Sequence, residues 1–168
     1  MGGRHPHPLP PLRKRQMPAG HHAGLNQINR NGQGDMRVTN ILTLTLKRKW
    51  FDLILAGTKT EEYREITDYW ARRFLNPKEE IEWQVWEEML DDMQDPFRRY
   101  NGPADLMAYL GIKFKDYEAI RFRNGYRKDS PVFTIDLAGI EIKQGREEWG
   151  AEKDKFYFVL QLGSKRNK

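Results

Sequence analysis

The sequence predicts an α+β protein: a small mixed β-barrel with flanking helices and a helical insertion at about residues 76–112. Three observations predict this fold. Strand-like alternation and helix-like spacing follow one another early in the chain, a middle stretch shows helical spacing alone, and the last third is rich in alternating segments. Strands on both sides of a block of helices are typical of α+β folds, and strands that bend sharply are typical of small barrels.

The first elements are a strand, a helix and a second strand. In residues 41–46 three leucines occupy alternate positions and share one face, whereas the two threonines lie on the other face. This alternation indicates a half-buried strand. Residues 47–56 change to helical spacing, and Gly57 suits the position just after the end of a helix. A charged extended segment, residues 59–66, follows.

The middle of the chain is predicted to be helical. Thr67 is a suitable N-cap for a short helix, which the Asn76-Pro77 pair ends. Residues 76–95 carry eight acidic side chains against one basic, a net charge of −7, and their apolar residues recur every four positions. This pattern predicts an amphipathic helix with an acidic outer face. Residues 103–110 form another short helix, since proline opens the segment and glycine follows it.

The last third is predicted to contain three strands, at residues 117–123, 132–142 and 156–162. Each shows the alternation of apolar residues that is typical of strands. In the second strand the apolar positions change from odd to even numbers. A β-bulge at Ala138-Gly139 accounts for that change.

The net charge of +5 over 168 residues first suggests a broadly basic nucleic-acid binder. Residues 1–35 carry +4 of it, however, and residues 36–168 hold 24 basic side chains against 23 acidic. Within that body, residues 76–95 carry −7 and the remainder +8. The basic character therefore belongs to the barrel, which favours a local, nucleotide-sized site.

The first 35 residues differ from the rest of the chain. They contain five of the nine prolines, six of the fourteen glycines and no aromatic residue, so we expect a disordered tail. Met36 precedes the first patterned segment, which suggests that the natural chain begins there and that the tail is not native. The domain then spans residues 36–168. With no secretory signal and no apolar run of membrane-spanning length, we expect a cytoplasmic protein without membrane contact.

The body lacks histidine and cysteine, because all four histidines lie in residues 1–35 and the chain has no cysteine. This excludes from the body a Ser-His-Asp triad, a cysteine nucleophile, disulfides and the usual zinc sites. We expect no metal and no cofactor. Any chemistry must come from Lys, Arg, Glu, Asp, Tyr, Ser or Thr.

The charged segment after Gly57 is the best candidate for a site. In a regular strand Glu62 and Arg64 point the same way, and Lys59, in the preceding turn, can reach the same side. A lysine, a carboxylate and a guanidinium would then suit a phosphate or a nucleobase. The alternative is a surface ion pair between Glu62 and Arg64.

Other candidates lie in the last third of the chain. Arg121 and Arg123 share one strand face and precede the turn signal Asn124-Gly125. Tyr126 and Trp149 fall in expected loops, where each either packs or stacks on a base. The remaining tryptophans with helical spacing are expected to pack in the core: Trp50, Trp70, Trp83 and Trp86.

These residues resemble the ASCH domain family, whose signature is G-x-K-x-x-E-x-R. Residues 119–126 and 148–150 are also similar to the small single-domain ASCH proteins of bacteria and phages, and the resemblance covers about residues 38–163. It implies a PUA-like fold, with the signature lining a cleft beneath the helix at residues 47–56, in a group linked to RNA binding and RNA modification. The signature is matched by Gly57, Lys59, Glu62 and Arg64.

The resemblance implies binding of RNA or of a modified nucleotide or nucleobase; the alternative is a hydrolase. Two small bacterial relatives are a ribonuclease and an amidohydrolase that deacetylates N4-acetylcytidine with the motif lysine, a threonine and a later glutamate. This chain has Glu62 at the threonine position, with Thr60 as the nearest hydroxyl. As a hydrolase it would use Lys59 and Glu62, and Glu148 or Glu152 would match the later glutamate by position. Whether it is an enzyme stays open.

The acidic helix, at residues 79–93, has two interpretations. It is either a docking face for a protein partner or a solvated outer face of the insertion. The sequence does not determine the oligomeric state.

Overall fold

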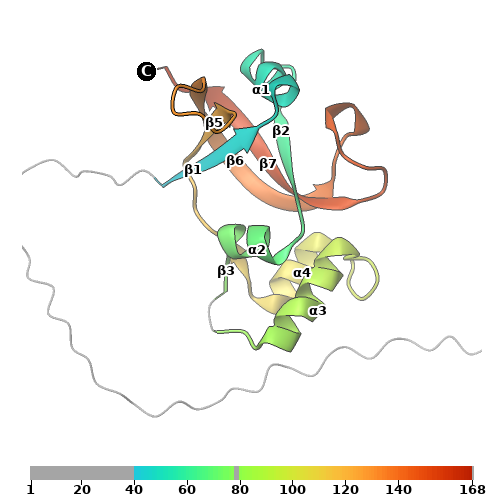
Figure 1. The fold of residues 1–168 in the computed structure, drawn as a ribbon. Helices are drawn as coiled ribbons and strands as arrows, with labels where there is room; N and C mark the ends of the chain where they lie inside the picture. The colour runs from blue at the N-terminus through green and yellow to red at the C-terminus, as the bar shows by residue number, and fades with distance from the viewer. Residues whose placement is uncertain (1–39, 78–79, 168) are drawn as a thin grey trace, which may run out of the picture. The chain divides into compact units, whose positions relative to one another are not determined.

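Five strands form one curled, half-barrel sheet in the computed structural model, which describes residues 40–77 and 80–167 (Figure 1). The spatial order is β1-β5-β6-β7-β2, in which β1 and β5 are parallel and the other neighbours antiparallel. The two edge strands, β1 and β2, do not pair with each other within the described residues, so the predicted barrel is open. The strands are β1 (Ile41–Leu46), β2 (Glu61–Glu65), β5 (Ala119–Asn124), β6 (Val132–Gln144) and β7 (Phe156–Lys165).

The described residues all belong to one of the two units into which the chain divides, Thr39–Lys168. The disorder predicted for residues 1–35 and the natural start suggested at Met36 lie outside the described residues. None of the described helices combines the length and the hydropathy that a membrane-spanning segment requires.

Helix α1 (Arg48–Leu55) connects β1 to β2, and Gly57 lies just after its C-cap residue Ala56, as the sequence predicts. The backbone N–H of Gly57 donates to the carbonyl of Ile54, and that of Thr58 donates to the carbonyl of Leu53. This pair of hydrogen bonds is a Schellman motif, and the φ angle of +77° at Gly57 is the left-handed conformation that the motif requires. The turn reverses the chain and places Lys59 two residues before β2.

Three further helices lie between β2 and β5: α2 (Asp68–Phe74) precedes the predicted insertion, whereas α3 (Trp83–Gln94) and α4 (Pro103–Leu110) lie within it. Thr67 caps α2 by accepting a hydrogen bond from the backbone of Trp70, and α4 has the predicted bounds. Two short strands that the sequence analysis missed, β3 (Leu75–Asn76) and β4 (Lys113–Phe114), pair with each other. Their pairing brings together the two ends of the segment that contains α3 and α4.

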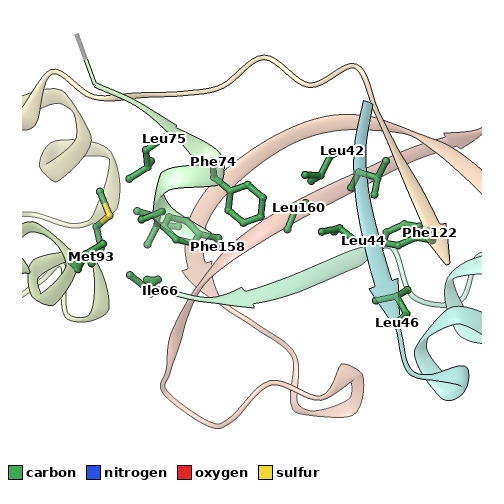
Figure 2. Close-up of a cluster of buried hydrophobic side chains, with 14 of the residues drawn as sticks. Leu42, Leu44, Leu46, Ile66, Phe74, Leu75, Met93, Phe122, Phe158 and Leu160 are labelled. Atoms are coloured by element: carbon green, nitrogen blue, oxygen red, sulfur yellow. The ribbon is translucent and has the colours of Figure 1, made fainter. Parts of the chain in front are cut away.

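The hydrophobic core is continuous from the sheet into the insertion (Figure 2). Alternation on β1 buries three leucines against β5, and the same inner face continues on β7. Side chains from α2 and α3 extend the cluster beyond the sheet. The labelled members are Leu42, Leu44, Leu46, Ile66, Phe74, Leu75, Met93, Phe122, Phe158 and Leu160.

The pairing of β6 with β7 shifts register between Ile135 and Leu137 and again between Leu137 and Gly139. The second shift confirms the irregularity predicted at Ala138-Gly139. Because the shift returns the apolar side chains to one face, Phe133 and Ile142 are both buried although one number is odd and the other even.

The acidic helix departs from the predicted pattern at two residues. Asp92 is only 1% exposed, and its carboxylate lies 3.0 Å from Arg98 Nη2 and 3.5 Å from Arg99 Nη1. Its buried carboxylate therefore pairs with two exposed arginines and does not belong to the acidic outer face. Trp83, predicted to pack in the core, is 55% exposed because it opens α3. A partner-docking role for the remaining acidic face stays a prediction.

Candidate functional site

A pocket of about 620 Å³ opens between the two edge strands of the sheet. Four segments line it: the end of β1 with the start of α1, the signature segment on β2, the turn between β5 and β6, and the loop between β6 and β7. β1 and β2 lie at opposite ends of the strand order, so the curl of the sheet is what brings them to one pocket (Figure 1).

Lys59 is buried at this pocket, with 2% of its surface exposed. Its ammonium lies 3.4 Å from Glu62 Oε2 and donates to the backbone carbonyl of Trp149 at 3.2 Å. It also lies 4.2 Å from the ring centre of Tyr63 and 5.3 Å from that of Trp50. A buried lysine charge is tolerated here because a carboxylate, a carbonyl and aromatic faces surround it.

Glu62 is shared by two cations. Its Oε1 lies 2.7 Å from Arg64 Nη1, while its Oε2 faces Lys59. Glu62 and Arg64 are paired with Leu160 and Phe158 of β7, so both point to the apolar inner face of the sheet. The Arg64 guanidinium also lies 4.9 Å from the ring centre of Trp70. The three signature side chains therefore meet at one place.

Burial lowers the pKa of the Lys59 ammonium below its ordinary value, although the neighbouring Glu62 carboxylate opposes that shift. Burial also raises the pKa of the Tyr63 hydroxyl well above its ordinary value. Both shifts have the same cause, since a low-dielectric environment disfavours the charged form of either group. Lys59 is therefore closer to its neutral, nucleophilic form than a solvated lysine would be.

A second polar cluster supports the outer face of β2 behind the pocket. The Tyr63 hydroxyl donates to Glu61 at 2.8 Å and accepts from the backbone N–H of Arg146 at 3.1 Å. Burial alone would raise the pKa of Glu61, but hydrogen bonds from Lys143 and Tyr63 hold it below its ordinary value. This cluster fixes the Tyr63 ring, on which the Lys59 ammonium lies.

Four aromatic side chains border the pocket: Trp50, Tyr63, Tyr126 and Trp149. Trp50 was predicted to pack in the core, but it is half-buried and contributes to the pocket wall. Tyr126 is 91% exposed at the rim, on the turn after β5. Exposed rings of this kind are available to stack on a planar ligand.

Gly150 brings the loop between β6 and β7 against Trp50. A Cβ atom at Gly150 would lie 2.6 Å from Trp50 Cζ2, and the residue has a φ angle of +92°. Both the close approach and the left-handed backbone require glycine. The pocket wall made by Trp149 and Gly150 thus depends on a residue without a side chain.

Some predicted site residues do not line the pocket. Arg121 and Arg123 lie on the outer face of β5, opposite to Ile120 and Phe122, whereas Glu62 lies on the inner face. Arg121 is exposed, and Arg123 donates to the carbonyl of Arg127 at 2.6 Å, which closes the turn. Neither arginine lines the pocket, since the strand alternation turns both away from it, and a role for them in ligand binding stays a prediction.

The remaining predictions divide between the pocket and its surroundings. Asn124, Tyr126 and Trp149 line the pocket, whereas Gly57 lies outside the lining, in the turn that follows α1. Glu148, the candidate for a later catalytic carboxylate, is exposed and lies 3.4 Å from Arg146 Nη1. Glu152, the alternative to Glu148, pairs with Lys155 at 2.8 Å, and Thr60, the nearest hydroxyl to the missing threonine, is exposed; neither residue lines the pocket.

Sequence reasoning missed several residues that border the pocket. Thr45 and Lys47 do so because β1 ends beside β2, a relationship that depends on the curl of the sheet. Tyr63 lies on the opposite strand face from Glu62 and was not considered. It contributes because the pocket extends around the free edge of β2, and no local signal indicates that edge.

The pocket suits a planar ligand with a hydrogen-bonding edge and an anionic group. Its ionisable lysine, arginine and glutamate side chains comprise three cations, Lys47, Lys59 and Arg64, and one carboxylate, Glu62. In residues 40–77 and 80–167, no group of three or more His, Asp or Glu side chains is arranged to hold a metal ion. The residues that line the pocket can form hydrogen bonds, ion pairs and stacking contacts, and Lys59 or Glu62 can transfer a proton.

No family model matches the sequence, and neither the curated proteins nor the solved structures include a match.

Proposed function

We propose that the pocket binds a nucleobase, presented by a nucleotide or by RNA. The observation that carries the proposal is the meeting of the Lys59-Glu62-Arg64 cluster with exposed and half-buried aromatic rings around one opening. The volume falls within the range of small-molecule sites, roughly 300 to 1,000 Å³. A base offers both a π-face and a hydrogen-bonding edge, which the two kinds of lining residue complement.

Each part of the lining has a role in this proposal. Glu62 accepts a hydrogen bond from an amine or ring N–H of the base, since each carboxylate oxygen has a second lone pair. Lys47, exposed at the rim, pairs with a phosphate, and Tyr126 stacks on the base. Stacking is worth about 1 to 3 kcal/mol for each base. With a few charge-assisted hydrogen bonds, micromolar affinity, about 8 kcal/mol, is attainable.

We further propose that the chain is an ASCH-type protein with a PUA-like fold. Support comes from the positions of the signature residues: Lys59, Glu62 and Arg64 line the pocket, and Gly57 shapes the turn before them. The half-barrel sheet with α1 beside the pocket is compatible with the cleft that the resemblance implies.

Tryptophan fluorescence titration tests the proposed binding, because Trp50 and Trp149 border the pocket. The probes are AMP, CMP, GMP, UMP, N4-acetylcytidine and a short single-stranded RNA. We expect at least one probe to change the emission with a Kd in the micromolar range. Unchanged emission with all of them, together with no heat of binding by calorimetry, would contradict the proposal.

Two exposed cations provide a matched pair of variants for this titration. Lys47→Ala removes a cation from the pocket rim, and Arg121→Ala removes one from the outer face of β5. Binding of a phosphorylated probe should weaken several-fold in the first variant and stay unchanged in the second. Equal weakening in both would indicate non-specific attraction of the anion rather than a site.

A second candidate function is hydrolysis of an acylated nucleoside or of RNA. It is favoured by the lowered pKa of Lys59 beside the Glu62 carboxylate. In this mechanism Lys59 or Glu62 moves a proton to or from water, and Arg64 stabilises the developing oxyanion, with general acid–base catalysis worth about 10² to 10⁴-fold. Incubation with N4-acetylcytidine and a short RNA, followed by chromatography, detects this activity. A folded Lys59→Ala variant with the wild-type rate would eliminate this candidate.

A further inference from the structure

The Lys59 ammonium has its hydrogen-bonding capacity met inside the protein. It has three N–H groups, and three acceptors surround it: the Trp149 carbonyl at 3.2 Å, Glu62 Oε2 at 3.4 Å and the face of the Tyr63 ring at 4.2 Å from its centre. Glu62 is similarly buried, but each of its oxygens keeps a second lone pair for a ligand, whereas all three N–H groups of Lys59 have acceptors within the protein. Its position therefore differs from that of a cation that contacts a ligand.

One of these acceptors belongs to the loop that forms the far wall of the pocket. Trp149 ends the 3₁₀ helix η1 (Glu147–Trp149) in the loop between β6 and β7. That loop also meets the signature segment through the hydrogen bond from the Arg146 backbone to the Tyr63 hydroxyl, 3.1 Å. Gly150 packs on Trp50. Lys59 supplies a charge-assisted tie between this loop and β2.

We infer that Lys59 is a positioning residue, which holds the loop carrying Trp149 against Glu62 and so sets the shape of the pocket. The inference rests on the proposed function in treating the pocket as a binding site. The ligand then meets Glu62, Arg64 and the aromatic rings, whereas Lys59 acts on it through Trp149 and Glu62. This role differs from that of a lysine that binds a phosphate or reacts with a substrate.

Hydrogen exchange with mass spectrometry on the free protein tests the tie directly. Lys59→Met keeps the length of the side chain but removes all three donors, so the Trp149 carbonyl must find water. Peptides covering residues 146–151 should exchange at least several-fold faster than in the wild type, while peptides from β1 and β5 keep their rates. Lys47→Met, which removes an exposed ammonium from the same pocket, should leave the loop unchanged. Unchanged exchange in the Lys59→Met loop would overturn the inference.

Acylation of the wild-type lysines with acetic anhydride provides a second measurement that does not depend on whether the variant folds. Lys59 should react at least ten times more slowly than Lys47, because the enclosure of its amine outweighs the larger neutral fraction that its lowered pKa provides. Comparable rates would contradict the inference. A ligand-contacting lysine would instead react in the free protein and become protected when a bound probe covers it.

A spectroscopic signature distinguishes local positioning from a general loss of stability. The part of the fluorescence that depends on Trp149, obtained by comparison with Trp149→Phe, should become more accessible to acrylamide in Lys59→Met. If Lys59→Met were only less stable, the acrylamide accessibility of the Trp149 fluorescence would equal that of the wild type at urea concentrations below the unfolding transition of the variant. That result would count against the inference. All three measurements use free protein, so a failure to bind any nucleotide would refute the proposed function and leave these results standing.

Discussion

Arg64 Nη1 lies 2.7 Å from Glu62 Oε1 on the inner face of an edge strand, where the neighbouring positions of β7 are phenylalanine and leucine. Glu62 is 4% exposed and also faces Lys59, so one carboxylate balances two cations in a largely apolar setting. An arrangement of this kind is costly to desolvate and does not by itself stabilise a fold. Its presence at a pocket is consistent with the proposed role in ligand binding.

Replacement of Glu62 by glutamine should destabilise the protein by about 2 to 3 kcal/mol, because Lys59 and Arg64 lose their counter-charge while buried. Urea unfolding measures the change. Glu152→Gln is the control, since it breaks an exposed ion pair with Lys155 and should cost less than about 1 kcal/mol. Equal losses of stability in the two variants would show that Lys59 and Arg64 do not depend on the Glu62 carboxylate as their counter-charge.

The lowered pKa of Lys59 predicts a pH dependence of stability in the alkaline range. The unfolded chain keeps the lysine proton up to about pH 10.5, whereas the folded protein releases it earlier. Between those two pKa values the unfolded state binds more protons, so the wild type gains stability as pH rises. Relative to Lys59→Met, the free energy of unfolding of the wild type should therefore increase as the pH rises through the alkaline range towards 10.5. A constant difference would contradict the prediction, and taking the difference cancels the opposing contribution of Tyr63, whose raised pKa affects both proteins.

The sequence pattern predicted correctly those parts of the fold that are determined by residues close together in the chain. Gly57, Thr67 and the helix at residues 103–110 were placed correctly because turn, cap and helix-start chemistry act within a few residues. The open sheet was not predicted, because whether β1 meets β2 depends on the curl accumulated over five strands. The strands β3 and β4 were missed since two-residue strands carry no periodicity.

The candidate site was predicted in part for the same reason. Lys59, Glu62 and Arg64 belong to one short segment, and alternation on a strand relates two of them. The same alternation sends Arg121 and Arg123 to the outer face, but sequence alone did not say which face of β5 is turned to the pocket. Trp50 sits on a helical stripe like a core residue, and only the approach of Gly150 shows that it forms a wall.

Gly150→Ala should disturb both stability and the pocket. The left-handed backbone costs about 1 to 2 kcal/mol for a residue with a Cβ atom, and contact with Trp50 at 2.6 Å adds to it. We expect a loss of about 2 kcal/mol or more in urea unfolding, together with a shift of the Trp50 emission. Gly139→Ala is the matched control, because a Cβ atom there meets nothing within 4 Å. A shift of similar size in the control would exclude the close approach as the cause.

Asp92→Asn should destabilise the insertion even though Asp92 looks like one of many surface acids in the sequence. Its buried carboxylate faces Arg98 and Arg99, and neutralising it leaves both with a weaker acceptor. The expected loss is about 1 to 3 kcal/mol in urea unfolding. Asp91→Asn, the exposed neighbour on α3, should change stability by about 0.5 kcal/mol or less. The reverse order would contradict the assignment of Asp92 to a buried carboxylate that pairs with Arg98 and Arg99.

Tyr126→Ala should separate binding from stability. The side chain is 91% exposed, so its removal should leave the urea midpoint almost unchanged, yet it lines the pocket rim beside Asn124 and Gly125. If it stacks on a base, its loss costs about 1 to 3 kcal/mol of binding, a roughly 5- to 150-fold increase in Kd for the nucleotide that the titration identifies. Tyr126→Phe keeps the ring and should bind like the wild type. Tyr69→Ala, which removes an exposed ring outside the pocket lining, should also bind normally. If Tyr126→Ala binds as well as these two controls, the ring does not stack, and recognition must depend on the half-buried walls formed by Trp50 and Trp149.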